Sequence, residues 1–98
     1  MNPPSRDIDD LVQSISALAR RAVAEYAPLV EAIVRDQTRD ADHIERTLDG
    51  LLDFGFDPEA LLLYKKLCRH YYFIDPTAAA YYVHVYREMW DSEPEAQP

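Results

Sequence analysis

Two Asp-Pro pairs, Asp57-Pro58 and Asp75-Pro76, constrain the fold of this chain more than any other feature. In each pair the aspartate is placed to accept a hydrogen bond from the free backbone N–H groups of a helical first turn. The proline then takes the first helical position, where its missing N–H costs nothing and its fixed φ suits a helix. Because the pairs lie 18 residues apart, they predict two consecutive helices whose short link forces them to be antiparallel neighbours.

Apolar residues recur at helical spacing after both pairs, which predicts that one face of each helix packs against a core. The first stripe is Ala60, Leu63, Tyr64, Leu67 and Tyr71, and the second is Ala79, Tyr82, Val83, Tyr86, Met89 and Trp90.

The chain before this hairpin also reads as helical. Residues 7–37 carry one apolar stripe that keeps its phase through Pro28, which favours a single kinked helix over two independent ones. Asp40 is placed to cap a further helix over residues 41–53. We therefore expect an all-α bundle of four or five helices, with a kinked N-terminal helix and a C-terminal antiparallel helical hairpin packed against it.

Length and composition are typical of one small folded unit. The 98 residues, 48% of them apolar, suffice for one core. We expect a frayed N-terminal tail over residues 1–5, a single helical domain over 6–91, and a disordered acidic tail over 92–98, where the composition shifts to Glu, Pro, Ser and Gln.

Charge and hydropathy exclude several functional classes. A net charge of −8 argues against binding to duplex DNA, because phosphate contacts depend on clustered Lys and Arg. The mean hydropathy of −0.36 and the lack of a long apolar run argue against a membrane span. A single cysteine, Cys68, and no visible secretory signal predict a cytoplasmic setting.

Catalytic and metal sites are only weakly indicated. His84 and Glu88 are four residues apart on one predicted helix face, a spacing that can bind a metal. With the carboxylates of residues 45–53 they allow a small metal-assisted hydrolase, but an exposed polar pair explains the spacing more simply. Cys68 and His70 are two apart and point away from each other on a helix. The sequence therefore predicts no catalytic residue, no metal site and no cofactor.

The aromatic residues are concentrated in the hairpin, which holds or adjoins ten of the eleven, from Phe54 to Trp90. Tyr71-Tyr72 and Tyr81-Tyr82 are adjacent pairs, so the members of each pair cannot face the same core. Tyrosine combines an apolar ring with a polar tip and therefore serves both core boundaries and interfaces. The predicted partner surface consists of Lys65, Lys66, Arg69, Tyr72, Tyr81 and Val85.

The leading functional hypothesis is a non-enzymatic protein-interaction or regulatory module that binds a protein partner, or a second copy as a homodimer, through this hairpin. The alternative is a nucleic-acid-associated accessory factor, in which bases stack on tyrosines near Lys65, Lys66, Arg69 and Arg87. The net charge disfavours nucleic acid as the partner.

Three runs of the sequence carry a resemblance to other proteins: residues 44–54 (IERTLDGLLDF), 61–69 (LLLYKKLCR) and 86–90 (YREMW). Over residues 44–91 the chain resembles small uncharacterised helical proteins of gut anaerobic bacteria, some of them carried on mobile elements. The resemblance implies a bacterial cytoplasmic setting and an accessory role to a mobile element. It implies no activity and no site.

Overall fold

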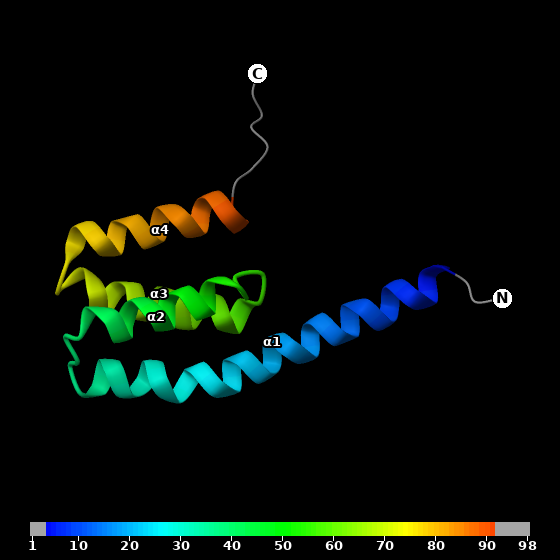
Figure 1. Ribbon diagram of the computed structural model, residues 1–98, viewed down its shortest axis with the longest axis horizontal. Helices are drawn as coiled ribbons and strands as arrows, with labels where there is room; N and C mark the ends of the chain where they lie inside the picture. Colours follow the sequence, from blue (N-terminus) through cyan, green and yellow to red (C-terminus); the bar gives the residue numbers. More distant parts are fainter. Residues whose placement is uncertain (1–3, 92–98) are drawn as a thin grey trace, which may run out of the picture.

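The protein is all-helical in the computed structural model, which describes residues 4–91 and the side chains from residue 7 onward. The described part contains four helices: α1 (Pro4–Arg35), α2 (Ala41–Leu52), α3 (Pro58–Tyr72) and α4 (Pro76–Trp90). The predicted all-α class is confirmed. Figure 1 shows α3 and α4 running in opposite directions along the chain.

Aspartate side chains begin three of the four helices. Asp57 Oδ2 accepts hydrogen bonds from the backbone N–H groups of Glu59 and Ala60, both at 3.0 Å. Asp75 Oδ1 accepts from the N–H of Ala78 at 3.0 Å, and Asp40 caps α2 in the same way. Each carboxylate satisfies N–H groups that have no partner inside the helix. The starts of α2, α3 and α4 are therefore determined by local sequence.

Helix α1 runs without interruption through Pro28. The prediction of one segment over two is confirmed, and the ribbon of α1 bends along its length (Figure 1); a local kink at Pro28 itself stays a prediction. The helix begins at Pro4, so residues 4 and 5, assigned above to a frayed tail, are helical. Residues 1–3 and the predicted acidic tail over 92–98 lie outside the described residues.

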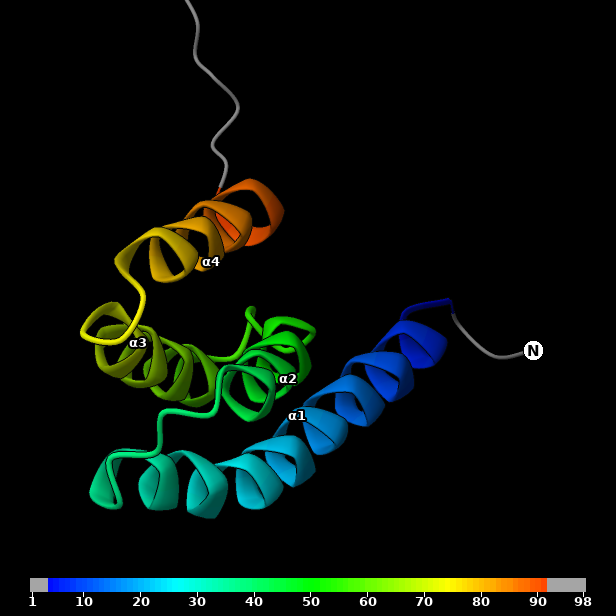
Figure 2. The same ribbon diagram turned by 60° about the vertical axis from the view of Figure 1, so that its left-hand side comes forward.

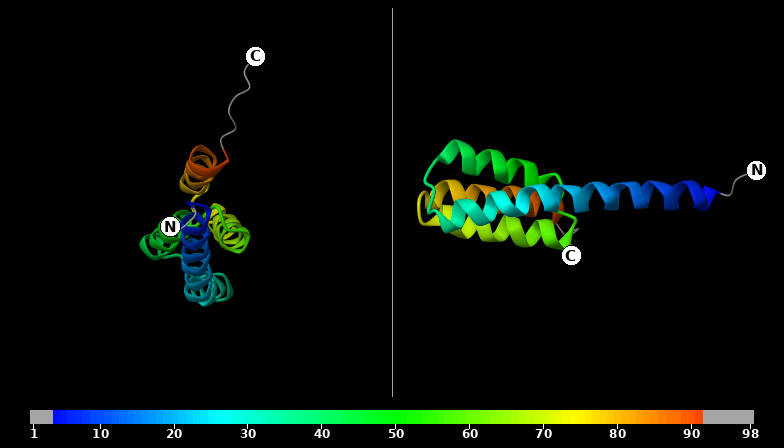
Figure 3. Two further views of the ribbon diagram at one scale, coloured as in Figure 1. Left: turned by 90° about the vertical axis from the view of Figure 1, so that its right-hand side faces the viewer. Right: turned by 90° about the horizontal axis from the view of Figure 1, so that it is seen from below.

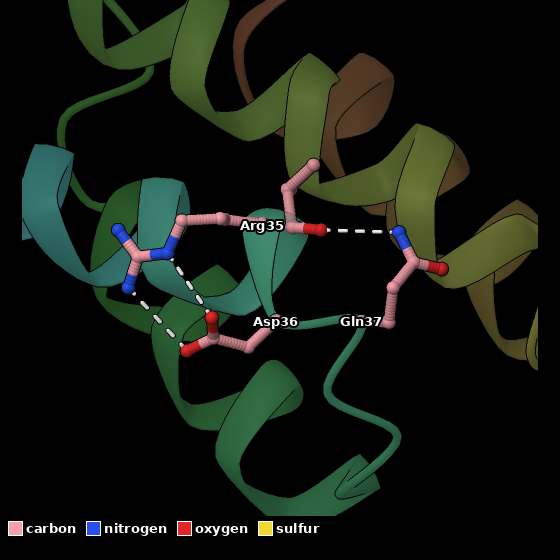
Figure 4. Close-up of polar contacts among 4 residues, drawn as sticks. Arg35, Asp36 and Gln37 are labelled. Carbon is pink, nitrogen blue, oxygen red and sulfur yellow. Dashed lines mark hydrogen bonds and ion pairs between the residues drawn. The ribbon is translucent and has the colours of Figure 1, made fainter.

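Helix α1 ends at Arg35, two residues before the predicted end at residue 37. It ends there because Gln37 adopts a left-handed backbone conformation with φ of 55°. The N–H of Thr38 donates to the carbonyl of Ile33 at 3.0 Å, and the N–H of Gln37 donates to the carbonyl of Val34 at 3.3 Å. This pair of bonds is the Schellman motif, which satisfies carbonyls at a helix end. Figure 4 shows the side chains here: Gln37 Nε2 also donates to the Val34 carbonyl, and Arg35 pairs with Asp36.

Replacing Gln37 with glycine should stabilise the protein by about 0.5–1 kcal/mol, because only glycine adopts the left-handed conformation without a Cβ penalty. Urea denaturation followed by circular dichroism would measure the change in the free energy of unfolding. Gln37→Asn should fall between the two, since Asn tolerates this conformation better than Gln. A destabilised Gln37→Gly variant would mean that the Gln37 side-chain bond to Val34 outweighs the backbone strain.

The helices lie in three layers. Figures 1 and 2 show α1 on one side, α2 and α3 in the middle, and α4 on the far side of α3. Helix α3 packs against all three others. The predicted packing of the C-terminal hairpin against the N-terminal helix is made chiefly through α3, whereas α4 packs chiefly on α3.

The core is continuous across these layers. Its buried members are Val30, Ile33, Ile44, Leu48, Leu51, Ala60, Tyr64, Leu67, Cys68, Tyr71, Ala79 and Tyr82. Only the last two come from α4, because that helix meets the core along its first half. Gly50 of α2 lies against the Tyr26 ring of α1, where any larger side chain would displace the ring. A glycine inside a helix is tolerated here because it permits this close packing.

Candidate partner-binding surface

An open groove lies between α3 and α4, with a volume of about 790 Å³. Its apolar wall includes Leu61, Ala80 and Val83, and its end is formed by Tyr72 and Phe73. The groove exists because α4 meets the bundle chiefly through α3, so the side of the α3–α4 contact on which Val83 lies stays open. Val83 is 41% exposed, Tyr72 57% and Phe73 79%.

Three cations also line the groove: Lys65 and Arg69 from α3, and Arg87 from α4. Asp91 is the one acidic residue among its lining residues. The protein as a whole carries a net charge of −8, so this local excess of positive charge runs against the average of the chain. Charges of one sign gathered along a concave apolar surface favour a ligand of the opposite sign.

The structure brings together only half of the predicted partner surface. Lys65, Arg69 and Tyr72 share the groove. Tyr81 is 61% exposed but is not among the groove residues, and its ring lies edge-on to that of Tyr82 at 5.4 Å. Val85 is half-buried and also lies outside the groove.

Lys66 belongs to a different surface from the other two cations of α3. Its Nζ forms an ion pair with Glu31 of α1, at 2.8 Å from Oε1. Both side chains are substantially exposed, so the pair contributes little to stability. The ion pair nevertheless keeps the positive charge of Lys66 beside α1 and away from the α3–α4 groove.

Val83 and Arg87 are groove residues that the sequence-based surface did not include. Val83 was assigned to the predicted core stripe because, like Tyr82 and Tyr86, it recurs at helical spacing along that stripe. Its exposure follows from the position of α4 on the outside of the bundle. Arg87 appeared only among the cations proposed to bind nucleic acid. It lies 18 residues after Arg69, at the equivalent position of a second helix that also begins with Asp-Pro. This equivalence was the sequence signal that could have placed Arg87 on the same surface as Arg69.

The adjacent tyrosines divide as expected. Tyr71 and Tyr82 are buried, whereas Tyr72 and Tyr81 are exposed. Tyr71 donates its phenolic hydrogen to Glu45 of α2, and Tyr64 Oη donates to the Tyr82 carbonyl at 2.6 Å, which joins α3 to α4. Burial is the main reason that the pKa values of Tyr64, Tyr71 and Tyr82 lie well above the ordinary value for tyrosine. These three rings support the fold, and the exposed two are free for contact.

Cys68 and His70 were the candidates for nucleophilic catalysis, and the described residues do not arrange them for it. Burial raises the pKa of the Cys68 thiol to about 12, which suppresses the reactive thiolate at neutral pH. His70 Nε2 lies 2.8 Å from the Thr38 carbonyl, so its ring is engaged with the α1–α2 turn. Cys68 and His70 therefore do not form a nucleophile–base pair.

The candidate metal ligands remain a surface pair. His84 Nε2 lies 3.4 Å from Glu88 Oε2, and both side chains are about two-thirds exposed. Within residues 4–91 no group of three or more His, Cys, Asp or Glu side chains is close enough to hold a metal ion. Glu45 of α2, one of the carboxylates considered for a metal site, instead accepts a hydrogen bond from Tyr71.

In the described part of the chain no helix combines the length and the apolar character that a membrane span needs.

No protein family, curated protein or solved structure matches this chain. The resemblance to proteins of gut anaerobes accordingly stays a prediction from the sequence, and the site has to be judged on its own geometry.

Proposed function

We propose that the protein is a non-enzymatic interaction module that binds an acidic amphipathic segment of a partner protein in the α3–α4 groove. The observation that supports this proposal is the groove itself, in which Lys65, Arg69 and Arg87 border an apolar surface. A helical segment with apolar residues at positions i, i+4 and i+7 would cover Val83 and the neighbouring rings. Acidic residues beside that stripe would pair with the three cations.

The charges of the groove disfavour a homodimer through the same surface. Symmetric pairing of two copies places the same patch of each copy against the other. It would bring Lys65, Arg69 and Arg87 of one copy close to the same cations of the second, at a cost in like-charge repulsion. A foreign acidic segment avoids this repulsion, so it is the occupant we propose.

The setting follows from the resemblance noted in the sequence. If the chain shares the setting of the helical proteins of gut anaerobes, the module acts in the bacterial cytoplasm as an accessory factor of a mobile element. Its role would then be to recruit or regulate the protein that carries the acidic segment.

The test is a selection of random displayed peptides on the immobilised protein, followed by affinity measurements on the selected peptides. We expect sequences with helically spaced apolar residues and several Asp or Glu. Reversing two groove charges, in Arg69→Glu/Arg87→Glu, should weaken their binding about tenfold or more, since two attractions become repulsions. Fluorescence anisotropy with labelled peptide would give the dissociation constants.

A matched control reverses two exposed cations outside both the groove and α1, Arg39→Glu/Arg46→Glu. This variant has the same net charge as the groove variant, so retained affinity would assign the effect to the groove. Peptides in which Lys replaces the acidic residues should in turn bind the groove variant better than the wild type. Selected peptides that bind all variants equally would contradict the proposal, and salt-sensitive retention of single-stranded nucleic acid would support the alternative.

A further inference from the structure

The first half of α1 projects beyond the rest of the molecule as an arm. Helix α1 has 32 residues, whereas α2 has 12 and α3 and α4 have 15 each. At 1.5 Å per residue these shorter helices can cover only about half of α1. Figures 1 and 3 show the uncovered half, in blue, extending away from the bundle. We define the arm as residues 7–18.

The arm carries large aliphatic side chains that stay largely exposed, although Val12 and Ile15 of this set line a cavity with Phe56 and Pro58. Their exposed fractions are 59% for Ile8, 60% for Leu11, 54% for Val12, 42% for Ile15 and 54% for Leu18. They continue the stripe that α1 buries from Ala19 onward, where Ala19, Val30 and Ile33 are 1% exposed or less. An exposed run of apolar side chains on a soluble helix marks an interaction surface.

The spacing of these residues is that of a coiled-coil seam. Ile8, Leu11, Ile15 and Leu18 are separated by 3, 4 and 3 residues, the order of the a and d positions of a heptad. In parallel coiled coils, β-branched residues at a with leucine at d favour two strands over larger assemblies. Because the bundle already holds α1 helical, pairing of the arm would not have to bear the full cost of helix nucleation.

We propose that the arms of two copies of this chain pair side by side in antiparallel orientation, centred near Gln13. In this register Ile8 packs on Leu18 of the second copy, and Leu11 packs on Ile15. All four seam positions of each arm are then matched with large aliphatic residues. The arrangement has two-fold symmetry and closes at a dimer.

The charges beside the seam select this orientation. The arm begins with Asp7, Asp9 and Asp10, and Arg20 and Arg21 follow its end. Antiparallel pairing places Asp7 beside Arg21 of the second copy on both sides of the symmetry axis. Parallel pairing would bring the acidic ends of both arms together and leave the arginines facing one another. A second copy therefore complements the arm in charge as well as in shape.

This dimer would leave the α3–α4 groove open. Figures 1 and 2 place α1 and α4 on opposite sides of the middle layer, and no residue of the arm lines that groove. The inference therefore does not depend on the proposed partner binding. A dimer would present two grooves and could bind a repeated acidic segment with increased avidity.

The first measurement is the mass of the full chain by sedimentation equilibrium as a function of concentration. We expect the mass to rise from 11.3 kDa toward twice that value, with a dissociation constant on the order of 10 µM for so short a seam.

The double variant Leu11→Glu/Leu18→Glu should weaken the dimer by a factor of roughly thirty or more, because it places charges in the seam. Its helix content and unfolding midpoint should stay close to those of the wild type, since both leucines are exposed in the monomer. A wild-type chain that stays monomeric at about millimolar concentration would overturn the proposal.

Charge exchange tests the register. Asp7→Arg and Arg21→Asp should each weaken the dimer about tenfold, because each acts at both ends of the seam. The double variant should return to within about threefold of the wild type, since it restores opposite charges. Failure of the double variant to recover would overturn the antiparallel register.

Cross-linking gives an independent readout of the same geometry. Ser14→Cys places a thiol beside its own copy across the axis, so oxidised glutathione should convert it to a disulfide-linked dimer. Gln13→Cys, on the outward face, should not cross-link, and the native Cys68 is buried. The reverse pattern would overturn the register. If Arg69→Glu/Arg87→Glu abolished the dimer, the arm would instead sit in the groove of a second copy, which would also overturn the proposal.

Discussion

Raising the pH from about 8 to about 11 is expected to lower the free energy of unfolding by several kcal/mol, a large part of the stability of a domain of this size. The loss comes from four buried groups: Tyr64, Tyr71, Tyr82 and Cys68. Burial raises the pKa of each of them in the folded state, and that of Cys68 reaches about 12. Nearby carboxylates add to the effect at Tyr71, bonded to Glu45, and at Tyr82, near Asp49.

The direction of the effect follows from proton binding. A group with a raised folded-state pKa keeps its proton in the native protein at a pH where the unfolded chain releases it. Stability is therefore complete below the unfolded pKa, about 8.5 for cysteine and about 10 for tyrosine, and falls above it. At about pH 11 a phenol that keeps its proton in the folded protein contributes a loss of at most about 1.4 kcal/mol, and the thiol contributes at most about 3 kcal/mol.

Urea titrations at several pH values, followed by far-ultraviolet circular dichroism, would measure this loss. In Cys68→Ala the loss of stability that begins below about pH 10 should disappear, while the loss caused by the tyrosines should remain. An unfolding midpoint that is unchanged up to about pH 11 would mean that the three phenols ionise in the folded protein without penalty. Such a result would contradict their burial.

Replacing Trp90 with alanine is expected to lower the free energy of unfolding by about 3 kcal/mol, the low end for a large aromatic residue because the side chain is 40% exposed. Trp90 Nε1 donates a hydrogen bond to the Leu52 carbonyl at the end of α2, at 2.7 Å. The indole also lies edge-on to the Phe56 ring, with ring centres 5.7 Å apart. Gly55 leaves the space for it, since a Cβ there would clash with the indole.

The second half of α4 depends on this contact. Ala79 and Tyr82, the buried residues of α4, both lie in its first half. Without the indole, residues 84–91 should exchange their amide hydrogens faster than the rest of the helix. The same loss would disturb the groove, because Arg87 and Asp91 lie in this segment.

Chemical denaturation followed by circular dichroism suits this comparison, because the chain has only one tryptophan and the variant loses its fluorescence signal. Trp90→Phe keeps an aromatic ring but has no N–H donor, so its loss should be limited to about 1 kcal/mol plus the smaller contact area. Equal stability of the alanine variant and the wild type would contradict the anchoring role. Fast exchange confined to α4 would confirm it.

The sequence by itself determined the helices, because their signals are local. Asp57-Pro58 and Asp75-Pro76 set helix starts through bonds within one turn, and the structure places α3 and α4 where these pairs predict. Adjacency on a helix also decided that one member of each tyrosine pair is exposed, since neighbouring side chains point about 100° apart, and the phase of the apolar stripe decided which one. The left-handed turn at Gln37 was missed because the common signal for it, a glycine, is absent.

Only the tertiary structure decided which apolar faces are covered. Ile15 and Ile33 belong to one stripe with one spacing, yet Ile33 is 1% exposed and Ile15 42%, because the neighbouring helices are shorter than α1. Val83 had the pattern of a core residue, and the position of α4 on the outside of α3 left it in the groove. Likewise the pairing of Lys66 with Glu31 joins residues 35 apart, which no local pattern encodes. Periodicity determines that a face is apolar, whereas burial depends on which other helices are long enough and close enough to reach it.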